Sequence, residues 1–149
     1  MPEDAPALKP STVAVTAGRP DKQPDAPLNT PITMASTYVA GGDLEYGRYA
    51  NPTWTAFEET LGGLEGGRCL SFASGLSAVA TVLDLVGQGG RVVAPRHAYN
   101  GTVMQLADLE ARGRLHAELV DITDTDAVVA ACDGAALVWL ESPTNPALE

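Results

Sequence analysis

Apolar residues recur at helical spacing in two stretches of the chain. The first stretch begins at Asn51-Pro52, a capping residue followed by a first-turn proline, and ends at Gly66-Gly67. Its apolar stripe consists of Trp54, Phe57, Leu61 and Leu64. The second stretch follows Ser74-Gly75 and stops at Gly87. Its stripe consists of Val79, Val82, Leu83 and Val86. We expect a helix in each stretch.

Short apolar runs between such stretches predict four strands. They are Cys69–Ala73, Arg91–Pro95, Leu115–Val120 and Ala136–Leu140. Further helices are predicted from Tyr99 to about Ala111 and from the capping residue Asp124 through Ala131. Regular alternation of strand and helix favours right-handed crossovers, and therefore an α/β fold with a mainly parallel sheet and helices on both faces.

The beginning of the chain has a different pattern. Seven of the 11 prolines lie in residues 1–31, where apolar periodicity is weak. We therefore expect residues 1–50 to form an extended or irregular arm that needs another surface to lie against. Residues 51–149 are then the α/β domain.

The charge balance excludes some classes of partner. Nine Lys and Arg stand against 19 Asp and Glu, a formal net charge of −10. Such a chain repels nucleic-acid backbones and anionic lipid, so we expect neither nucleic acid nor a membrane as a partner. Cys69 and Cys132 lack zinc-site spacing and are expected to be buried free thiols. Without a leader or a long apolar run, a cytoplasmic location is expected.

Candidate chemistry follows the predicted strands, because ligands of parallel sheets sit at the carboxyl ends of strands. Ser74-Gly75-Leu76 opens a helix whose free N–H groups and dipole favour an anion, although Gly75 could equally serve only the turn. Tyr99 could stack on a planar ligand or simply pack. Asn145, between two prolines, could bind a ligand hydroxyl or only shape its loop.

Tyr46 and Arg48 form a second candidate, ahead of the first long helix. Two residues apart in an extended backbone, their side chains would point the same way. A guanidinium beside a phenol hydroxyl can clamp a phosphate. Taken singly, Arg48 is better explained by an exposed salt bridge.

Four motifs in this order and spacing resemble one enzyme family. They are YGRYANPT (46–53), LEGGRCLSFASGLSA (64–78), HAYNGT (97–102) and LESPTNP (140–146). The chain is similar, from about residue 28 to its last residue, to the pyridoxal-phosphate enzymes of cysteine and methionine metabolism, such as cystathionine gamma-synthase, cystathionine gamma-lyase and methionine gamma-lyase. The resemblance implies the first part of the large domain of a fold-type I pyridoxal-phosphate-dependent transferase.

The resemblance also implies roles for the candidate residues. Tyr46 and Arg48 would reach into a neighbouring subunit and hold the cofactor's phosphate there. Backbone amides of Gly75 and Leu76, with Ser74 beside them, would hold the same phosphate. The site would therefore lie at a subunit interface of a homo- or hetero-oligomer.

The pyridine ring would be bound by the remaining motifs. Tyr99 would stack on the ring, Asn145 would approach its hydroxyl, and Glu141 would have a more structural role. The chain departs from the family pattern at Leu76, where methionine is usual, and at Asn100, where glycine is common. The first is a volume-conserving change that leaves backbone binding intact.

The family's Schiff-base lysine lies beyond the LESPTNP motif and has no counterpart here. Only Lys9 and Lys22 are present, both in the proline-rich arm. We therefore expect a part of a larger catalytic unit that needs a lysine-bearing carboxyl-terminal half or paralogous subunit. The expected reaction is elimination or replacement at the gamma or beta carbon of a sulfur amino acid or an activated homoserine ester.

Two other functions compete with this expectation. One is a degenerate, regulatory or partner-binding subunit that keeps the fold without the chemistry. The other is an unrelated nucleotide-binding domain, which is disfavoured because the chain lacks both G-x-G-x-x-G after its first strand and a Walker lysine.

Overall fold

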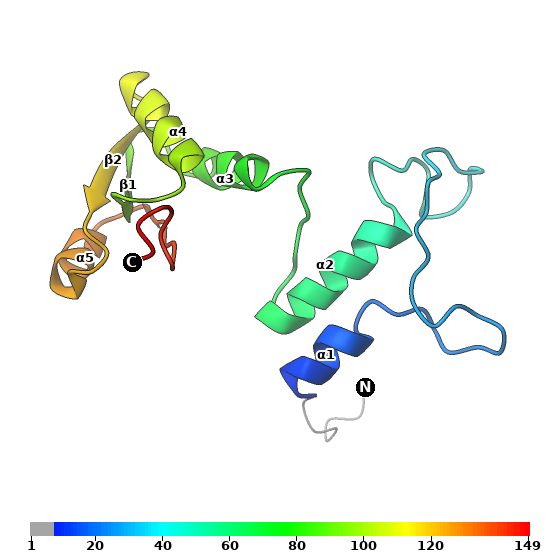
Figure 1. The fold of residues 1–149 in the computed structure, drawn as a ribbon. Helices are drawn as coiled ribbons and strands as arrows, with labels where there is room; N and C mark the ends of the chain where they lie inside the picture. The colour runs from blue at the N-terminus through cyan, green and yellow to red at the C-terminus, as the bar shows by residue number, and fades with distance from the viewer. Residues whose placement is uncertain (1–7) are drawn as a thin grey trace. The chain divides into compact units, whose positions relative to one another are not determined.

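The computed structural model describes residues 8–149 as two compact units, so residues 1–7 of the predicted arm lie outside the described residues. Unit 1 ends at Ser71 and contains helices α1 (Pro10–Thr16) and α2 (Pro52–Glu65). Unit 2 runs from Phe72 to Glu149 (Figure 1). Its elements are α3 (Gly75–Asp84), β1 (Gly90–Pro95), α4 (Asn100–Ala111), β2 (Leu115–Val120), α5 (Thr125–Cys132) and β3 (Leu137–Val138).

Helix α2 begins and ends where the sequence predicts. The Asn51 side chain accepts a hydrogen bond from the Thr53 N–H at 2.9 Å, and Pro52 occupies the first turn. At the other end, Gly66 adopts a left-handed conformation with φ of 72° and donates its N–H to the Gly62 carbonyl. A glycine adopts this conformation without steric cost, so the helix ends there.

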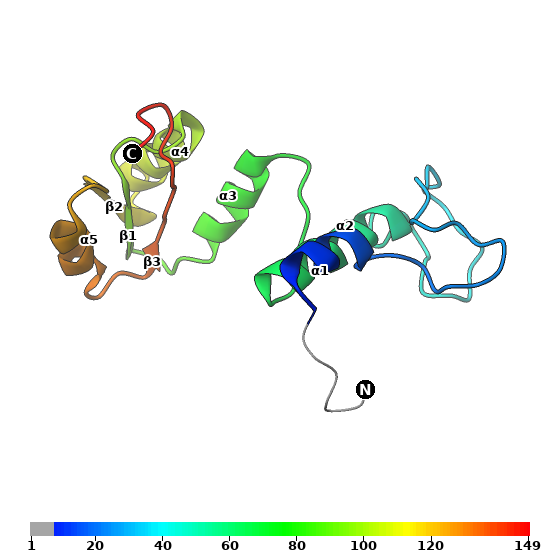
Figure 2. The same ribbon diagram turned by 60° about the horizontal axis from the view of Figure 1, so that its bottom comes forward.

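The arm is less irregular than predicted, because Pro10–Thr16 is helical. A proline in the first turn is compatible with a helix, so proline density alone was a poor guide. Helix α1 lies along α2 in unit 1 (Figure 2). Close to this contact, the Thr60 hydroxyl donates to the Ala17 carbonyl at 3.0 Å. Residues 17–50 contain no helix and only one isolated antiparallel bridge, between Thr37 and Tyr46.

Unit 2 contains a parallel three-stranded sheet in the order β2-β1-β3. Strand β1 pairs with β2 over its whole length, from Gly90 opposite Leu115 to Pro95 opposite Val120. It pairs with β3 through Val92 opposite Leu137. The mainly parallel sheet predicted from the sequence is thus confirmed.

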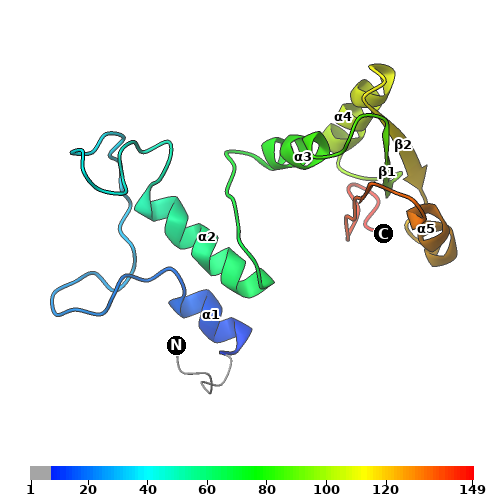
Figure 3. The same ribbon diagram turned by 180° about the vertical axis from the view of Figure 1, so that it is seen from behind.

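Helices cover both faces of β1 (Figure 3). Val92 and Ala94 belong to a core cluster with residues of α3 and α4, namely Val79, Leu83 and Leu106, and with Val86 and Leu115. Val93 and Pro95 face the other way and line an apolar gap with Val128 of α5. Residues 92–95 of β1 are buried on both faces, so this part of the strand is continuously apolar rather than alternating.

The predicted strand Cys69–Ala73 does not form. A strand needs a partner, and no segment within residues 8–149 pairs with this one. Instead, the Glu58 carboxylate accepts hydrogen bonds from the Ser71 N–H at 2.7 Å and from its hydroxyl at 2.8 Å. Both bonds lower the Glu58 pKa, and the bond from the Ser71 N–H has the larger effect. Leu70 is 70% exposed, so the apolar run is not buried either.

The predicted strand Ala136–Leu140 is shorter than expected. Only Leu137–Val138 is regular strand, although pairing with β1 extends further. The Ala136 N–H donates to the Arg91 carbonyl and the Trp139 N–H donates to the Val93 carbonyl, both at 2.8 Å.

Three observations bear on other classes of function. Cys69 and Cys132 are free thiols, but each is half-buried rather than buried. Within residues 8–149, no His, Cys, Asp and Glu side chains gather in threes where a metal ion could bind. No helix in the same range has the length and apolar character needed to cross a membrane.

We predict that the core of unit 2 depends on Leu106, which is 1% exposed. Leu106→Ala should lower the free energy of unfolding by about 2–5 kcal/mol, because it leaves a cavity between α4 and β1. Leu85→Ala is the matched control, since Leu85 is 82% exposed and its truncation should change stability by about 0.5 kcal/mol or less. Urea denaturation measures both, and equal effects would contradict this assignment of the core.

Candidate functional site

Two predicted motifs meet at the carboxyl edge of the sheet. Tyr99 follows β1 and Glu141 follows β3, although 42 residues separate them in the sequence. The Tyr99 N–H points at both carboxylate oxygens of Glu141, at 3.0 Å each. Parallel pairing of the two strands therefore places both motifs together, as expected from the sequence.

The first turn of α3 offers unpaired backbone donors at its N-terminus. Ser74 is the capping residue, and its hydroxyl oxygen accepts from the Ser77 N–H at 3.2 Å. Within the described residues, the N–H groups of Gly75 and Leu76 have no acceptor. A Cβ at Gly75 would meet no atom within 4 Å, so the space beside it is open. Free donors and the helix dipole suit an anion such as a phosphate.

Gly101 lies next to both the α3 turn and Tyr99. A Cβ built on Gly101 would lie 2.6 Å from Tyr99 Cε1 and 3.2 Å from Leu76 Cδ1. Both side chains therefore approach the space that a side chain at residue 101 would occupy. Tyr99 is 47% exposed, which leaves part of its ring available to a planar ligand. Nothing in the sequence pattern indicates this place of Gly101 beside Tyr99, apart from its position two residues later.

Asn145 lies exposed in the loop that follows β3. Its neighbour Thr144 is fully buried and anchors the loop. The Thr144 hydroxyl accepts from the Glu149 N–H at 3.0 Å, and the Thr144 carbonyl accepts from the Leu148 N–H at 2.9 Å. The carboxylate of Glu149 lies 2.9 Å from His97 Nδ1. An amide on an anchored loop is suited to bind a ligand hydroxyl.

Asp121 is an acidic group at the same edge, after β2. Its carboxylate accepts from the Thr123 hydroxyl at 2.7 Å and from the Thr123 N–H at 3.0 Å. Both bonds lower the Asp121 pKa, and the bond from the Thr123 hydroxyl has the larger effect. Its charge is thus satisfied within its own loop.

Tyr46 and Arg48 lie in unit 1, in a turn rather than the extended backbone predicted. The Tyr49 N–H donates to the Tyr46 carbonyl at 2.8 Å, which closes the turn. The turn still brings the two side chains together, with Arg48 Cζ 5.0 Å from the centre of the Tyr46 ring. The Tyr49 ring meets the Tyr46 ring edge-on at 5.6 Å.

Arg48 is exposed, and it forms no ion pair within residues 8–149. An intramolecular salt bridge, the competing explanation for this residue, is therefore not observed. Stacking on Tyr46 holds the guanidinium without consuming its N–H donors, which stay available to an anion.

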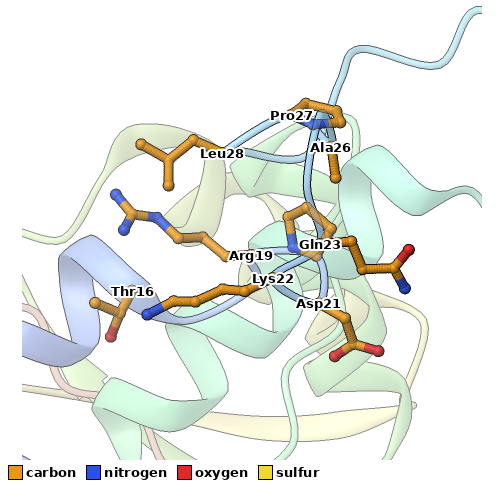
Figure 4. A pocket seen from close by; sticks show the side chains of 9 residues that line it. Thr16, Arg19, Asp21, Lys22, Gln23, Ala26, Pro27 and Leu28 are labelled. Carbon is orange, nitrogen blue, oxygen red and sulfur yellow. The ribbon is translucent and has the colours of Figure 1, made fainter.

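A hollow of about 380 Å³ in unit 1 contains none of the predicted site residues (Figure 4). It lies in the arm, where Arg19 and Lys22 line it with Thr16 and Leu28. Arg19 Nε donates to the Asn29 side chain at 3.0 Å. The candidate site is therefore marked by free backbone donors and strand ends, and not by this hollow.

Comparison with known proteins supports the motif pattern. Residues 11–149 match the model of the Cys/Met metabolism PLP-dependent enzyme family. A cystathionine gamma-synthase of Mycobacterium tuberculosis is 38% identical over 149 residues, covering 93% of this chain and 38% of the relative. A cystathionine gamma-lyase of Dictyostelium discoideum is 32% identical, with coverage of 93% and 38%.

Solved structures share the fold. A cystathionine gamma-lyase from Micromonospora echinospora superposes with a TM-score of 0.80 at 36% identity, over 95% of this chain and 39% of that chain. The 149 residues thus span about two fifths of the length of the curated relatives they match.

We predict that Gly75→Asp separates fold stability from anion binding. A carboxylate in the first turn should stabilise α3 by about 0.3–1 kcal/mol through the helix dipole, while repelling a phosphate from the same N–H groups. Gly75→Asn is the matched control, because it adds a side chain of the same shape without the charge. It should lack the dipole stabilisation and should not repel a phosphate.

Urea denaturation and a titration with pyridoxal phosphate measure the two effects. If the Gly75→Asp chain binds pyridoxal phosphate as well as the parent, the α3 N-terminus is not the phosphate site.

Proposed function

Since the chain belongs to the Cys/Met metabolism family of PLP-dependent enzymes, we propose that it supplies the phosphate- and ring-binding part of a transsulfuration-type catalytic site. The observation that carries this proposal is that the Leu76 and Tyr99 side chains both approach the same space beside Gly101. It joins an anion-binding helix terminus to an exposed aromatic ring, and pyridoxal phosphate combines a phosphate with a planar ring.

The residues present fit this cofactor. The N–H groups of Gly75 and Leu76, with Ser74 beside them, would bind the phosphate because they are unpaired and face open space. Tyr99 would stack on the pyridine ring, and Asn145 would donate to or accept from the ring hydroxyl.

Tyr46 and Arg48 complete the proposed phosphate clamp from a neighbouring subunit. Their cation–π contact holds the guanidinium over the Tyr46 ring, so one segment offers both a guanidinium and a phenol to a dianionic group. The arm that carries them exposes large apolar side chains, with Ile32 at 80%, Met34 at 90% and Val39 at 95% exposure. Such exposure favours an arm that packs on another subunit.

The reaction we propose is elimination or replacement at the gamma or beta carbon of a sulfur amino acid or an activated homoserine ester. Bound pyridoxal phosphate supplies an electron sink for the negative charge that develops at the alpha carbon of the substrate. The chain's own residues bind and orient this group, and none of those assigned above takes a proton from the substrate.

A lysine from outside these 149 residues is part of the proposal. Lys9 precedes α1 and Lys22 lines the hollow of the arm, so both belong to unit 1 and neither follows a strand of the sheet. The lysine that bonds the cofactor would come from a lysine-bearing remainder of the enzyme or from a paralogous subunit.

The first test follows from the positions of the two lysines. The 149-residue chain, mixed with pyridoxal phosphate and reduced with borohydride, should give no stoichiometric adduct at a single lysine. Peptide mapping by mass spectrometry measures this. A defined adduct at Lys9 or Lys22 in full yield would contradict the requirement for a lysine from elsewhere.

The second test concerns Arg48. In the assembled enzyme, Arg48→Ala should weaken cofactor binding by about 2–5 kcal/mol, because it removes one partner of a buried charge-assisted pair. Arg112→Ala is the matched control: Arg112 pairs with Asp108 on the exposed face of α4, and an exposed pair contributes about 0–1 kcal/mol. Arg96→Ala, at another exposed arginine, should have an equally small effect.

A cofactor titration separates these ranges. Mixing Arg48→Ala subunits with subunits that lack the catalytic lysine should restore part of the activity, since the clamp is proposed to act across the interface. Parent-like cofactor affinity of the Arg48→Ala enzyme would show that Arg48 is an ordinary surface charge.

A further inference from the structure

Gly101 and Glu141 both contact Tyr99, and neither is assigned above to touch the cofactor. We infer that they are positioning residues that together fix the Tyr99 ring relative to the N-terminus of α3. The inference rests on the proposed function and adds to it the groups that set the spacing between the phosphate and ring subsites.

Glu141 fixes the backbone of Tyr99. Tyr99 precedes the first residue of α4 and has no side-chain capping bond of its own. The Glu141 carboxylate, half-buried at the end of β3, takes the Tyr99 N–H between its two oxygens at 3.0 Å each. Tyr99 is thereby tied to the strand next to its own, so the start of α4 cannot shift without breaking this bond.

Glu141 also explains why a phosphate would bind at the N-terminus of α3 and not at that of α4. The carboxylate lies at the N-terminus of α4, where its charge is favourable to the helix dipole and unfavourable to a second anion. At α3 no carboxylate contacts the corresponding donors within the described residues, and the space beside Gly75 is open.

Gly101 sets how closely the Tyr99 ring can approach the backbone at the start of α4. A Cβ at this position would approach Tyr99 Cε1 to 2.6 Å and Tyr99 Cζ to 3.2 Å, well inside van der Waals contact. The backbone of Gly101 is helical, so the glycine is needed for space and not for an unusual φ. The neighbouring Asn100 has room for its side chain, whose amide donates to Met104 Sδ at 3.4 Å.

The position of the Tyr99 ring and the position of a phosphate on α3 are therefore coupled. Leu76 provides one of the unpaired N–H groups, and its side chain approaches the same space beside Gly101 as the Tyr99 ring. A ligand that places its phosphate on the α3 donors meets the ring at a distance set by these contacts. A Cβ at residue 101 would displace the ring most and press only on the end of the Leu76 side chain, so the backbone donors of α3 should stay in place.

The test compares two probes on the 149-residue chain: pyridoxal phosphate, which needs both subsites, and inorganic phosphate, which needs only the α3 donors. Gly101→Ala should weaken pyridoxal phosphate binding about three- to tenfold, the range expected for a disturbed aromatic stack. Inorganic phosphate, followed by NMR shifts of the Gly75 and Leu76 amides, should bind within about twofold of the parent. Asn100→Ala is the control and should change neither affinity.

Glu141 is tested by amide hydrogen exchange at Tyr99. Glu141→Ala should accelerate exchange of this amide about tenfold or more, and Glu141→Gln, which keeps one acceptor, should have a smaller effect. Nuclear Overhauser contacts between the Tyr99 ring and the Leu76 methyl groups should be present in the parent chain and reduced in Gly101→Ala.

The outcomes separate this inference from the proposed function. If the parent chain binds neither probe, the proposed site fails, while the exchange and Overhauser data still decide whether Gly101 and Glu141 position Tyr99. Unchanged pyridoxal phosphate affinity in Gly101→Ala overturns the inference. Equal losses for both probes also overturn it, because the glycine would then serve the fold as a whole.

Discussion

Parallel pairing of β1 with β2 and β3 is the constraint on which unit 2 depends. Because all three strands run the same way, the chain must return across the sheet between them, and α4 and α5 are those crossovers. The returns cover both faces of β1 and bury Val92 and Val93 on opposite sides. They also place the segments that follow β1 and β3 at one edge, where Tyr99 and Glu141 meet.

The site residues of unit 2 are held by the scaffold more firmly than their exposure indicates. Tyr99 and Asn145 are exposed, yet the backbone at each position is held in place. The Glu141 carboxylate binds the Tyr99 N–H, and the buried Thr144 anchors the loop of Asn145. A rigid sheet thus presents polar and aromatic groups at its edge without burying them, which is the arrangement expected for ligand binding on a parallel sheet.

The mismatch between sequence pattern and structure has a consistent cause. Cys69–Ala73 has the composition of a strand, but a strand exists only when paired, and Ser71 bonds to Glu58 instead. Pro10–Thr16 has the composition of a loop, but a first-turn proline permits a helix, and α2 offers a surface to pack on. In both places the partner decided the conformation, and a local pattern contains no information about partners.

By itself, the sequence determined the helices with strong end signals, the strands β1 and β2, the alternation that requires a parallel sheet, and the family motifs. These features depend on neighbouring residues, through capping at Asn51, the left-handed turn at Gly66 and continuous apolar runs. Only the tertiary structure decided that Gly101 lies under Tyr99, that Glu141 binds the Tyr99 amide, and that Arg48 stacks on Tyr46 in a turn. The first two join groups brought together by strand pairing or helix packing, and the third depends on how the arm folds back, so their distances follow from three-dimensional packing and not from sequence spacing.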